Sequence, residues 1–388
     1  MSPTLEARRI TRAIYTAGFL FAVHSALPAY VNATFLSSIT TERAVGIIFT
    51  VGSVLTILAF LNLAPLLNRF GNAPLLATLA ALECLLFAGI AFSRSPFITI
   101  ALFTASIIVA NIIGFNFDVL LENHSENKTT GTVRGTFLSS INAAWLFSPL
   151  AAGFLLGEDS YRLLYLIAAV VLIPVIAITL GAFRNERDPR YRERPLPQIV
   201  GNIPKHPNTY KILMSNFILQ LFFAWMVIYS PLYLHNHIGF SWQEIGVMFT
   251  IMLIPFVVLE APLGRLADRR LGEKELLSAG FIIAALGTAA LAFVTVKSAA
   301  LFTALLFLTR VGASMIEIMN ETYFFKKNDS RDADILRLFR MTRPAAYALA
   351  PLIATLLLPV VEFRFTFLAL GLLTLSGLYY STTLKDTR

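Results

Sequence analysis

Long apolar segments alternate with short polar ones along almost the whole chain. Segments of the roughly 20 residues needed to cross the hydrocarbon core of a bilayer predict about twelve membrane-spanning helices. Their expected limits are 11–36, 44–67, 74–92, 97–121, 136–156, 161–183, 211–234, 244–263, 275–296, 299–322, 338–359 and 363–383. A longer polar segment, rich in arginine and proline, follows the sixth of these. The pattern predicts an all-α membrane protein.

The composition agrees with a chain that is solvated by lipid. Of the 388 residues, 56% are hydrophobic and 14% are charged, whereas charged residues make up about a quarter of a soluble domain. The single cysteine, Cys84, excludes an intrachain disulfide. The N-terminus has the basic head of a signal peptide, but its apolar body is too long and lacks a cleavage site. We expect it to be retained as the first span.

Lysine and arginine are distributed unevenly between the two sides of the predicted helices. With a cytoplasmic N-terminus, 25 of the 31 lie on the cytoplasmic side, 5 on the other side, and Arg310 lies inside a span. This asymmetry predicts that both termini are cytoplasmic. The net charge of +8 does not indicate nucleic-acid binding, because no basic helix or aromatic-interleaved basic stripe is present. We expect an integral protein of a bacterial inner (plasma) membrane.

The two halves of the chain resemble each other. TERAVGIIFT at 41–50 matches SWQEIGVMFT at 241–250, and Gly71 matches Gly272 at a similar offset. A nearly constant offset predicts a duplicated six-helix unit, which is a transporter architecture. The expected divisions are an N-terminal bundle at 1–183, a cytoplasmic linker at 184–210 and a C-terminal bundle at 211–388.

The loop GRLADRRLGEK, which begins at Gly264, resembles the signature loop of the major facilitator superfamily. Its counterpart in the first half, APLLNRFGN, keeps Arg69 and Gly71 but lacks a glycine and an aspartate at the positions of Gly264 and Asp268. The resemblance implies two pseudo-symmetric six-helix bundles, alternating access, and a central cavity lined by the first, fourth, seventh and tenth helices. The drug/proton antiporters, with twelve helices, are the most similar type.

The chemistry of this loop predicts a gate on the cytoplasmic side. Gly264 would let two helices approach closely, and Gly272 would permit a tight turn. Asp268 is placed to accept a charge-assisted bond from an arginine and so hold the gate shut. The expected gate residues are Arg69, Gly71, Glu122, Arg134, Gly264, Asp268, Arg269, Gly272 and Glu321.

The tenth predicted span carries three charges, Arg310, Glu317 and Glu321. At 100° per residue they share one narrow helical face. Each charge near the bilayer centre costs roughly 2.5–3.5 kcal/mol on insertion scales, so the face must meet protein or a watery cavity. The fourth span repeats the pattern at an offset of 199, with Asn111, Asp118 and Glu122.

Two interpretations of these carboxylates remain open. They either form gate salt bridges with nearby arginines, or one of them binds and releases a proton. Glu317 is the first candidate for proton binding and Asp118 the second. Arg310 cannot lose its proton, so it either binds an anion or holds the carboxylates ionised.

Other polar and aromatic residues within the spans are candidates for the same pathway. His24, midway along the first span, either relays protons or packs through a hydrogen bond. Glu83, in the third span, is expected to face inward and to pair, but the sequence does not indicate its partner. Aromatic residues that form either a substrate wall or simple packing are Trp145, Trp225, Tyr229 and Tyr347.

No phosphate-binding glycine loop, HExxH or GxSxG motif occurs in the sequence, so we expect no enzyme, catalytic residue, metal or cofactor. The preferred function is proton-coupled export of a small organic cation or amphipath by a monomer, driven by the proton gradient. Alternatives are a transporter of an anionic metabolite or sugar, a lipid scramblase, and a non-transporting receptor. The expected pathway residues are His24, Asn111, Asp118, Arg310 and Glu317.

Overall fold

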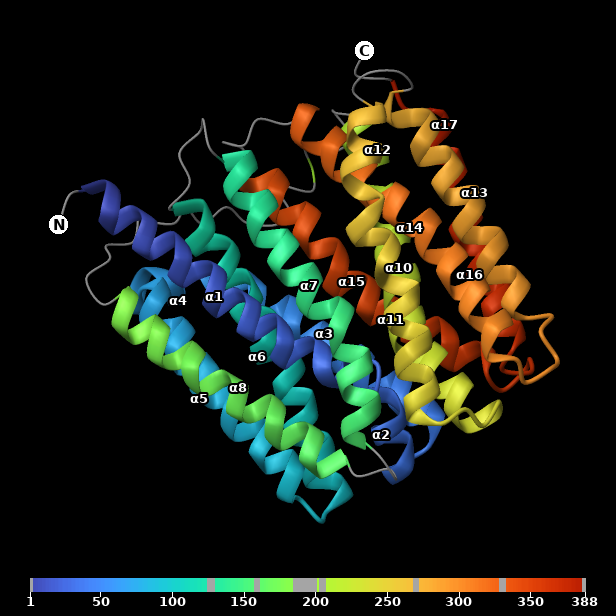
Figure 1. The fold of residues 1–388 in the computed structure, drawn as a ribbon, viewed down its shortest axis with the longest axis horizontal. Helices are drawn as coiled ribbons and strands as arrows, with labels where there is room; N and C mark the ends of the chain where they lie inside the picture. The colour runs from blue at the N-terminus through green and yellow to red at the C-terminus, as the bar shows by residue number, and fades with distance from the viewer. Residues whose placement is uncertain are drawn as a thin grey trace. The chain divides into compact units, whose positions relative to one another are not determined.

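A computed structural model describes residues 3–123, 130–156, 161–183, 201, 207–267, 272–327 and 333–385. Every secondary-structure element in these ranges is helical (Figure 1). The chain divides into two compact units. Unit 1 comprises Met1–Thr41 and Val51–Glu193, and unit 2 comprises Glu42–Thr50 and Arg194–Arg388. The division near residue 193 falls within the expected linker, whereas the start of the second expected span groups with unit 2.

Unit 1 is built from eight described helices, of which the third begins in unit 2. They are α1 (Pro3–Ala29), α2 (Asn32–Ile39), α3 (Glu42–Leu61), α4 (Leu63–Phe70), α5 (Asn72–Phe92), α6 (Pro96–Asn123), α7 (Thr130–Leu156) and α8 (Tyr161–Ala182). Helix α5 packs against α6 and α8, and α1 packs against α7 and α8. Their apolar faces meet in one core that includes Ile14, Leu76, Ile113 and Leu172, all fully buried.

Unit 2 contains the remaining described helices. They are α10 (Pro207–Leu232), the π-helical η2 (Tyr233–His237), α11 (Trp242–Val258), α12 (Glu260–Leu266), α13 (Glu273–Leu291), α14 (Ala299–Lys327), α15 (Ala333–Leu357), α16 (Phe365–Leu375) and α17 (Gly377–Thr382). Helix α14 packs against α10, α11 and α13, while α15 packs against α10. A methyl group added at Gly312 would lie 2.3 Å from the backbone nitrogen of Ala284. Glycine therefore allows α14 to approach the backbone of α13.

Eleven helical segments in the described part of the chain are long and apolar enough to cross a membrane. The expected twelfth, 338–359, falls in α15, which has 25 residues but does not reach the same apolarity. Arg337, Arg340 and Arg343 in its first half explain this, because arginine strongly disfavours the hydrocarbon core. The first helix also ends earlier than expected, at Ala29, next to Pro28, and the separate α2 follows it.

Two glycines at equivalent positions of the repeat make the same turn. Gly71 and Gly272 have φ values of 79° and 81°, a conformation that side chains other than that of glycine rarely adopt. Each directly precedes a helix, α5 or α13, so the tight turn expected at Gly272 is confirmed. The next residues, Asn72 and Glu273, are buried. The repeat is thus visible in the backbone as well as in the sequence.

Candidate functional site

The polar face of α14 begins at Arg310, a fully buried arginine with 1% of its surface exposed. Its guanidinium carbon lies 5.1 Å from the ring centre of Phe222 and 5.7 Å from that of Phe223, both on α10. Attraction between a cation and an aromatic face is worth about 2 kcal/mol or more when the cation is desolvated. Aromatic rings of α10 therefore help to hold a positive charge inside unit 2.

The two carboxylates of this face lie toward α15. Glu321 Oε1 is 3.6 Å from Arg340 Nη1, and both side chains are partly exposed. Glu317, one turn closer to Arg310, is half-buried and lies in the electrostatic field of Arg310, Arg340, Arg343 and Glu321. Glu321 thus forms a salt bridge, as the first of the two interpretations predicted, whereas Glu317 lies deeper along the helix and is surrounded by charges of both signs.

Helix α10 adds uncharged polar groups beside these charges. Ser215 donates a hydrogen bond to Asn320 Oδ1 at 2.7 Å, and the amide of Asn216 donates to Thr342 Oγ1 at 2.8 Å. Two fully buried donors, Asn320 Nδ2 and Trp225 Nε1, have no hydrogen-bond partner within the described ranges. A buried donor without an acceptor is unfavourable, so each can donate a hydrogen bond to water or to a polar ligand.

The corresponding face of α6 in unit 1 is less charged. The Asn111 amide donates to Ile107 O of its own helix at 2.8 Å, so it satisfies itself locally. Asp118 is half-buried. The side chain of Glu122 lies outside the described residues, as does that of Arg134, the proposed gate arginine on α7. Within the described part of unit 1, this face presents one carboxylate and no arginine.

Unit 1 instead holds its buried charge between α1, α5 and α6. His24 Nε2 lies 3.4 Å from Glu83 Oε1, and Ser106 donates to the same oxygen at 2.7 Å. His24 Nδ1 is 2.9 Å from the carbonyl oxygen of Ala168 on α8. The exposed fractions of His24 and Glu83 are 1% and 0%. The expectation that Glu83 faces inward and pairs is confirmed, and the structure identifies its partner as His24.

The structure describes only some of the gate residues predicted in the signature loop and its first-half counterpart. Asp268 and Arg269 lie outside the described residues. Arg69 is exposed and lies 5.2 Å from the ring centre of Phe70. At Gly264, an added methyl group would only touch Ile318, at 3.9 Å. The expectation that Gly264 is needed for close helix approach is therefore wrong, because space for a side chain remains there.

The four aromatic candidates lie in different surroundings. Trp225 and Tyr229 are 1% exposed, and their ring centres are 5.7 Å apart. In this conformation the pair forms part of the packing of unit 2. Tyr347 is half-buried beside the guanidinium of Arg343, at 5.8 Å. Trp145, half-buried in unit 1, packs edge-on against Tyr30.

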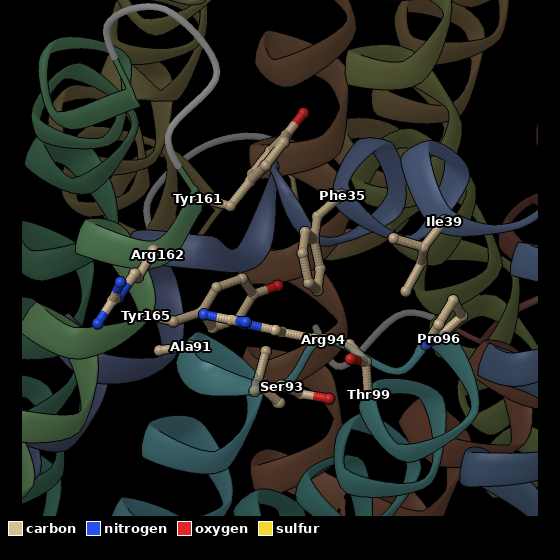
Figure 2. Close-up of a pocket in the computed structure, with 11 residues that line it drawn as sticks. Phe35, Ile39, Ala91, Ser93, Arg94, Pro96, Thr99, Tyr161, Arg162 and Tyr165 are labelled. Carbon is tan, nitrogen blue, oxygen red and sulfur yellow. The ribbon is translucent and has the colours of Figure 1, made fainter.

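A pocket of about 300 Å³ opens within unit 1, where α2, α5, α6 and α8 approach one another. Figure 2 shows the side chains of Arg94 and Arg162 on the same side of it, with the aromatic ring of Phe35 nearby. Arg162 also lies 4.4 Å from the ring centre of Phe92. In the sequence, both arginines are simply among the five basic residues expected on the non-cytoplasmic side. Both arginines line the same pocket, so its positive charge suits an anionic group.

These features agree with the comparisons with known proteins. The sequence model of the Major Facilitator Superfamily matches residues 14–328 and 212–387, so the chain belongs to this family. The fold is similar to the crystal structure of a mutant of the nucleoside transporter NupG, with a TM-score of 0.75 and 11% identity. The alignment covers 97% of this chain and 99% of that one. No curated protein matches the sequence. The protein is an integral membrane protein of a transporter family.

Proposed function

We propose that the protein is a secondary active transporter that exports a small organic cation or cationic amphipath in exchange for protons. It works by alternating access as a monomer, in a bacterial inner (plasma) membrane with both termini cytoplasmic. The proton gradient supplies the energy without a cofactor. The observation that carries the proposal is the half-buried carboxylate of Glu317 on the same helical face as the buried Arg310.

Glu317 supports exchange because a carboxylate can hold either a proton or a cationic substrate. In a poorly hydrated site an uncompensated carboxylate is unfavourable, so one of the two should be bound whenever the site is closed to water. Arrival of the cation favours the ionised carboxylate and releases the proton. A proton arriving from the other side then displaces the cation. Exchange of one for one follows if the two cannot bind together.

Arg310 sets the electrostatic limits of this exchange. Its charge is permanent, and the rings of Phe222 and Phe223 hold the guanidinium in place. Arg310 lies about two turns from Glu317, or roughly 10 Å along the helix. At this distance its charge favours the ionised form of Glu317 without occupying the position of the cationic substrate. We therefore assign Arg310 an orienting role and Glu317 the coupling role.

A second candidate function is transport of an anionic metabolite or a sugar. Buried Arg310 favours an anion, as do Arg94 and Arg162 at the unit 1 pocket. NupG, which shares the fold, is a nucleoside transporter, so nucleosides belong among the compounds to test. At 11% identity, this likeness indicates the fold and leaves the substrate open.

Transport into proteoliposomes with an imposed pH gradient tests the proposal. Panels of organic cations, organic anions, sugars and nucleosides are offered, and substrate accumulation is measured together with internal pH. We expect a cation to accumulate against its gradient while protons move the opposite way. Accumulation of an anion or a sugar alone would instead establish the second candidate.

The Glu317→Gln variant tests the assigned residue, because glutamine keeps the size of the side chain but cannot ionise. It should abolish proton-driven accumulation while downhill exchange of substrate continues. Glu321→Gln is the matched control on the same face and should retain accumulation at a reduced rate. If Glu317→Gln still concentrates substrate, the coupling role of Glu317 is wrong.

A further inference from the structure

A buried acid–base pair in unit 1 takes no part in the exchange proposed at Glu317. Helix α1 supplies His24 and α5 supplies Glu83, while Ser106 of α6 and the Ala168 carbonyl of α8 complete their surroundings. None of the three side chains is more than 6% exposed. Four helices thus converge on one cluster in the core of a single unit.

The carbonyl of Ala168 fixes one proton of the cluster. A carbonyl oxygen has no hydrogen to donate, so the 2.9 Å contact with His24 Nδ1 requires a hydrogen on that nitrogen. The other ring nitrogen, Nε2, faces Glu83 Oε1. It either donates to a carboxylate from an imidazolium, or accepts from a carboxylic acid as part of a neutral imidazole. In both arrangements the pair holds two protons and has no net charge.

Loss of one proton would leave an unfavourable arrangement. The lone pair of Nε2 would then face an ionised carboxylate, and one net negative charge would remain in a site that excludes water. Glu83 Oε2 is also buried and has no hydrogen-bond partner among the described residues, which adds to the penalty for ionising the acid. The closed cluster therefore favours the form with two protons.

The neighbouring helices supply little charge to compensate for that loss. On α5 the nearest ionisable group is the Cys84 thiol, and on α8 it is Tyr165, whose hydroxyl donates to Asn32 Oδ1 at 2.7 Å. Arg162 of α8 is directed toward the Phe92 ring.

The ionisable groups of the other helices are more distant. They are Tyr15 of α1, about 14 Å along the helix from His24, and Asp118 of α6, about 18 Å from Ser106. The described side chains of α7 include no ionisable group.

We propose that His24, Glu83 and Ser106 form a proton-binding site in the core of unit 1, separate from the carboxylates of α14. When occupied, the site holds two protons, whereas a neutral imidazole and a carboxylate together hold one. Releasing that proton leaves neutral His24 and ionised Glu83, so release requires water to reach the pair. Ser106 keeps Oε1 directed toward the imidazole in both forms. The site is independent of the transported substrate and of the role of Glu317.

Spectroscopy on the full-length protein in lipid nanodiscs tests this site without any substrate. Nitrogen-15 spectra of labelled histidine report which ring nitrogens of His24 carry hydrogen. Infrared spectra with labelled glutamate report whether Glu83 is a carboxylic acid or a carboxylate. At neutral pH we expect hydrogen on His24 Nδ1, together with either a second hydrogen on Nε2 or a carboxylic-acid band from Glu83. A His24 protonated only at Nε2, or a neutral His24 beside an ionised Glu83, would overturn the proposal.

Variants assign these signals. His24→Gln should remove the histidine signal, and Glu83→Gln the carboxylic-acid or carboxylate band. If either variant fails to fold, Ser106→Ala provides the assignment, because loss of its hydrogen bond to Oε1 should shift the Glu83 band and leave other glutamate bands unchanged. An unshifted spectrum would overturn the role of Ser106. Glu317→Gln is the matched control and should leave the His24 signal as it is in the parent protein.

Discussion

The two units of the protein share a backbone repeat but bury their charges in different places. In unit 2 the buried cation, Arg310, lies on α14 and packs against rings of α10. In unit 1 the equivalent position of α6 is Asn111, which bonds to its own helix, and the buried ionisable pair lies instead between α1 and α5. The repeat therefore preserves the positions of helices while their chemistry differs.

Helix packing shows the same contrast. Gly312 lets α14 meet the backbone of α13, whereas the residue at the corresponding offset of 199 in α6 is the fully buried Ile113. The polar residues after the two equivalent glycines also differ: Asn72 donates to the Asn116 carbonyl, and Glu273 pairs with Lys326. Unit 2 thus relies more on charge and close backbone contact, and unit 1 more on side-chain packing and neutral bonds.

The largest effect should distinguish Arg310 from its counterpart Asn111. In Arg310→Lys the charge remains, but an ammonium lacks the planar guanidinium that lies against Phe222 and Phe223. Loss of about 2 kcal/mol of interaction corresponds to a roughly 30-fold slower transport. Asn111→Ala should change the initial rate by less than about twofold, because its amide serves only its own helix. The measurement is the initial rate of substrate uptake at equal protein density.

Equal losses in the two variants would mean that the repeat preserves function as well as backbone. A harmless Arg310→Lys would show that only the charge of this residue matters. Thermal unfolding midpoints measured on the purified variants distinguish slow transport from poor folding.

The backbone was more predictable from the sequence than the site. The halving of the chain, most helix limits and the turn at Gly272 follow from apolar segment length and glycine spacing, which are local properties. The partner of Glu83 could not be predicted, because His24 and Ser106 come from other helices and contact depends on how these pack. The prediction for Gly264 was wrong for a related reason, because a glycine in a signature loop does not indicate whether another helix lies against it. Gly312, which does lie against another helix, is not part of that loop.

The next effect should appear in stability, at Gly312. In Gly312→Ala the new methyl group would meet backbone atoms of Gly280 and Ala284 at less than 3 Å, so α13 and α14 must separate. Overpacking of this kind costs about 3 kcal/mol. Gly264→Ala is the matched control in the same unit, since its methyl group has room beside Ile318. Thermal unfolding in detergent should show a clear decrease for the first variant only, and equal midpoints would refute the close contact.

The equivalent turns at Gly71 and Gly272 should respond alike. Alanine at either position would have to adopt a conformation with φ near 80°, which costs about 2 kcal/mol for a residue with a side chain. We therefore expect Gly71→Ala and Gly272→Ala to lower the unfolding midpoint by similar amounts. A decrease confined to one of them would show that the two turns, although alike in backbone, are not equally constrained in the two units.

The smallest effect should come from the ion pair between Glu321 and Arg340. Their closest atoms are 3.6 Å apart, and both side chains are partly exposed, so solvent screens the attraction and the pair contributes no more than about 1 kcal/mol. Arg340→Gln should therefore lower the unfolding midpoint slightly, and the difference should shrink further in high salt. Combining it with Glu321→Gln should add almost nothing, because the first change has already removed the pair. A large, salt-independent loss from Arg340→Gln alone would instead show that Arg340 acts mainly on Glu317, and that the polar face of unit 2 operates as one coupled network.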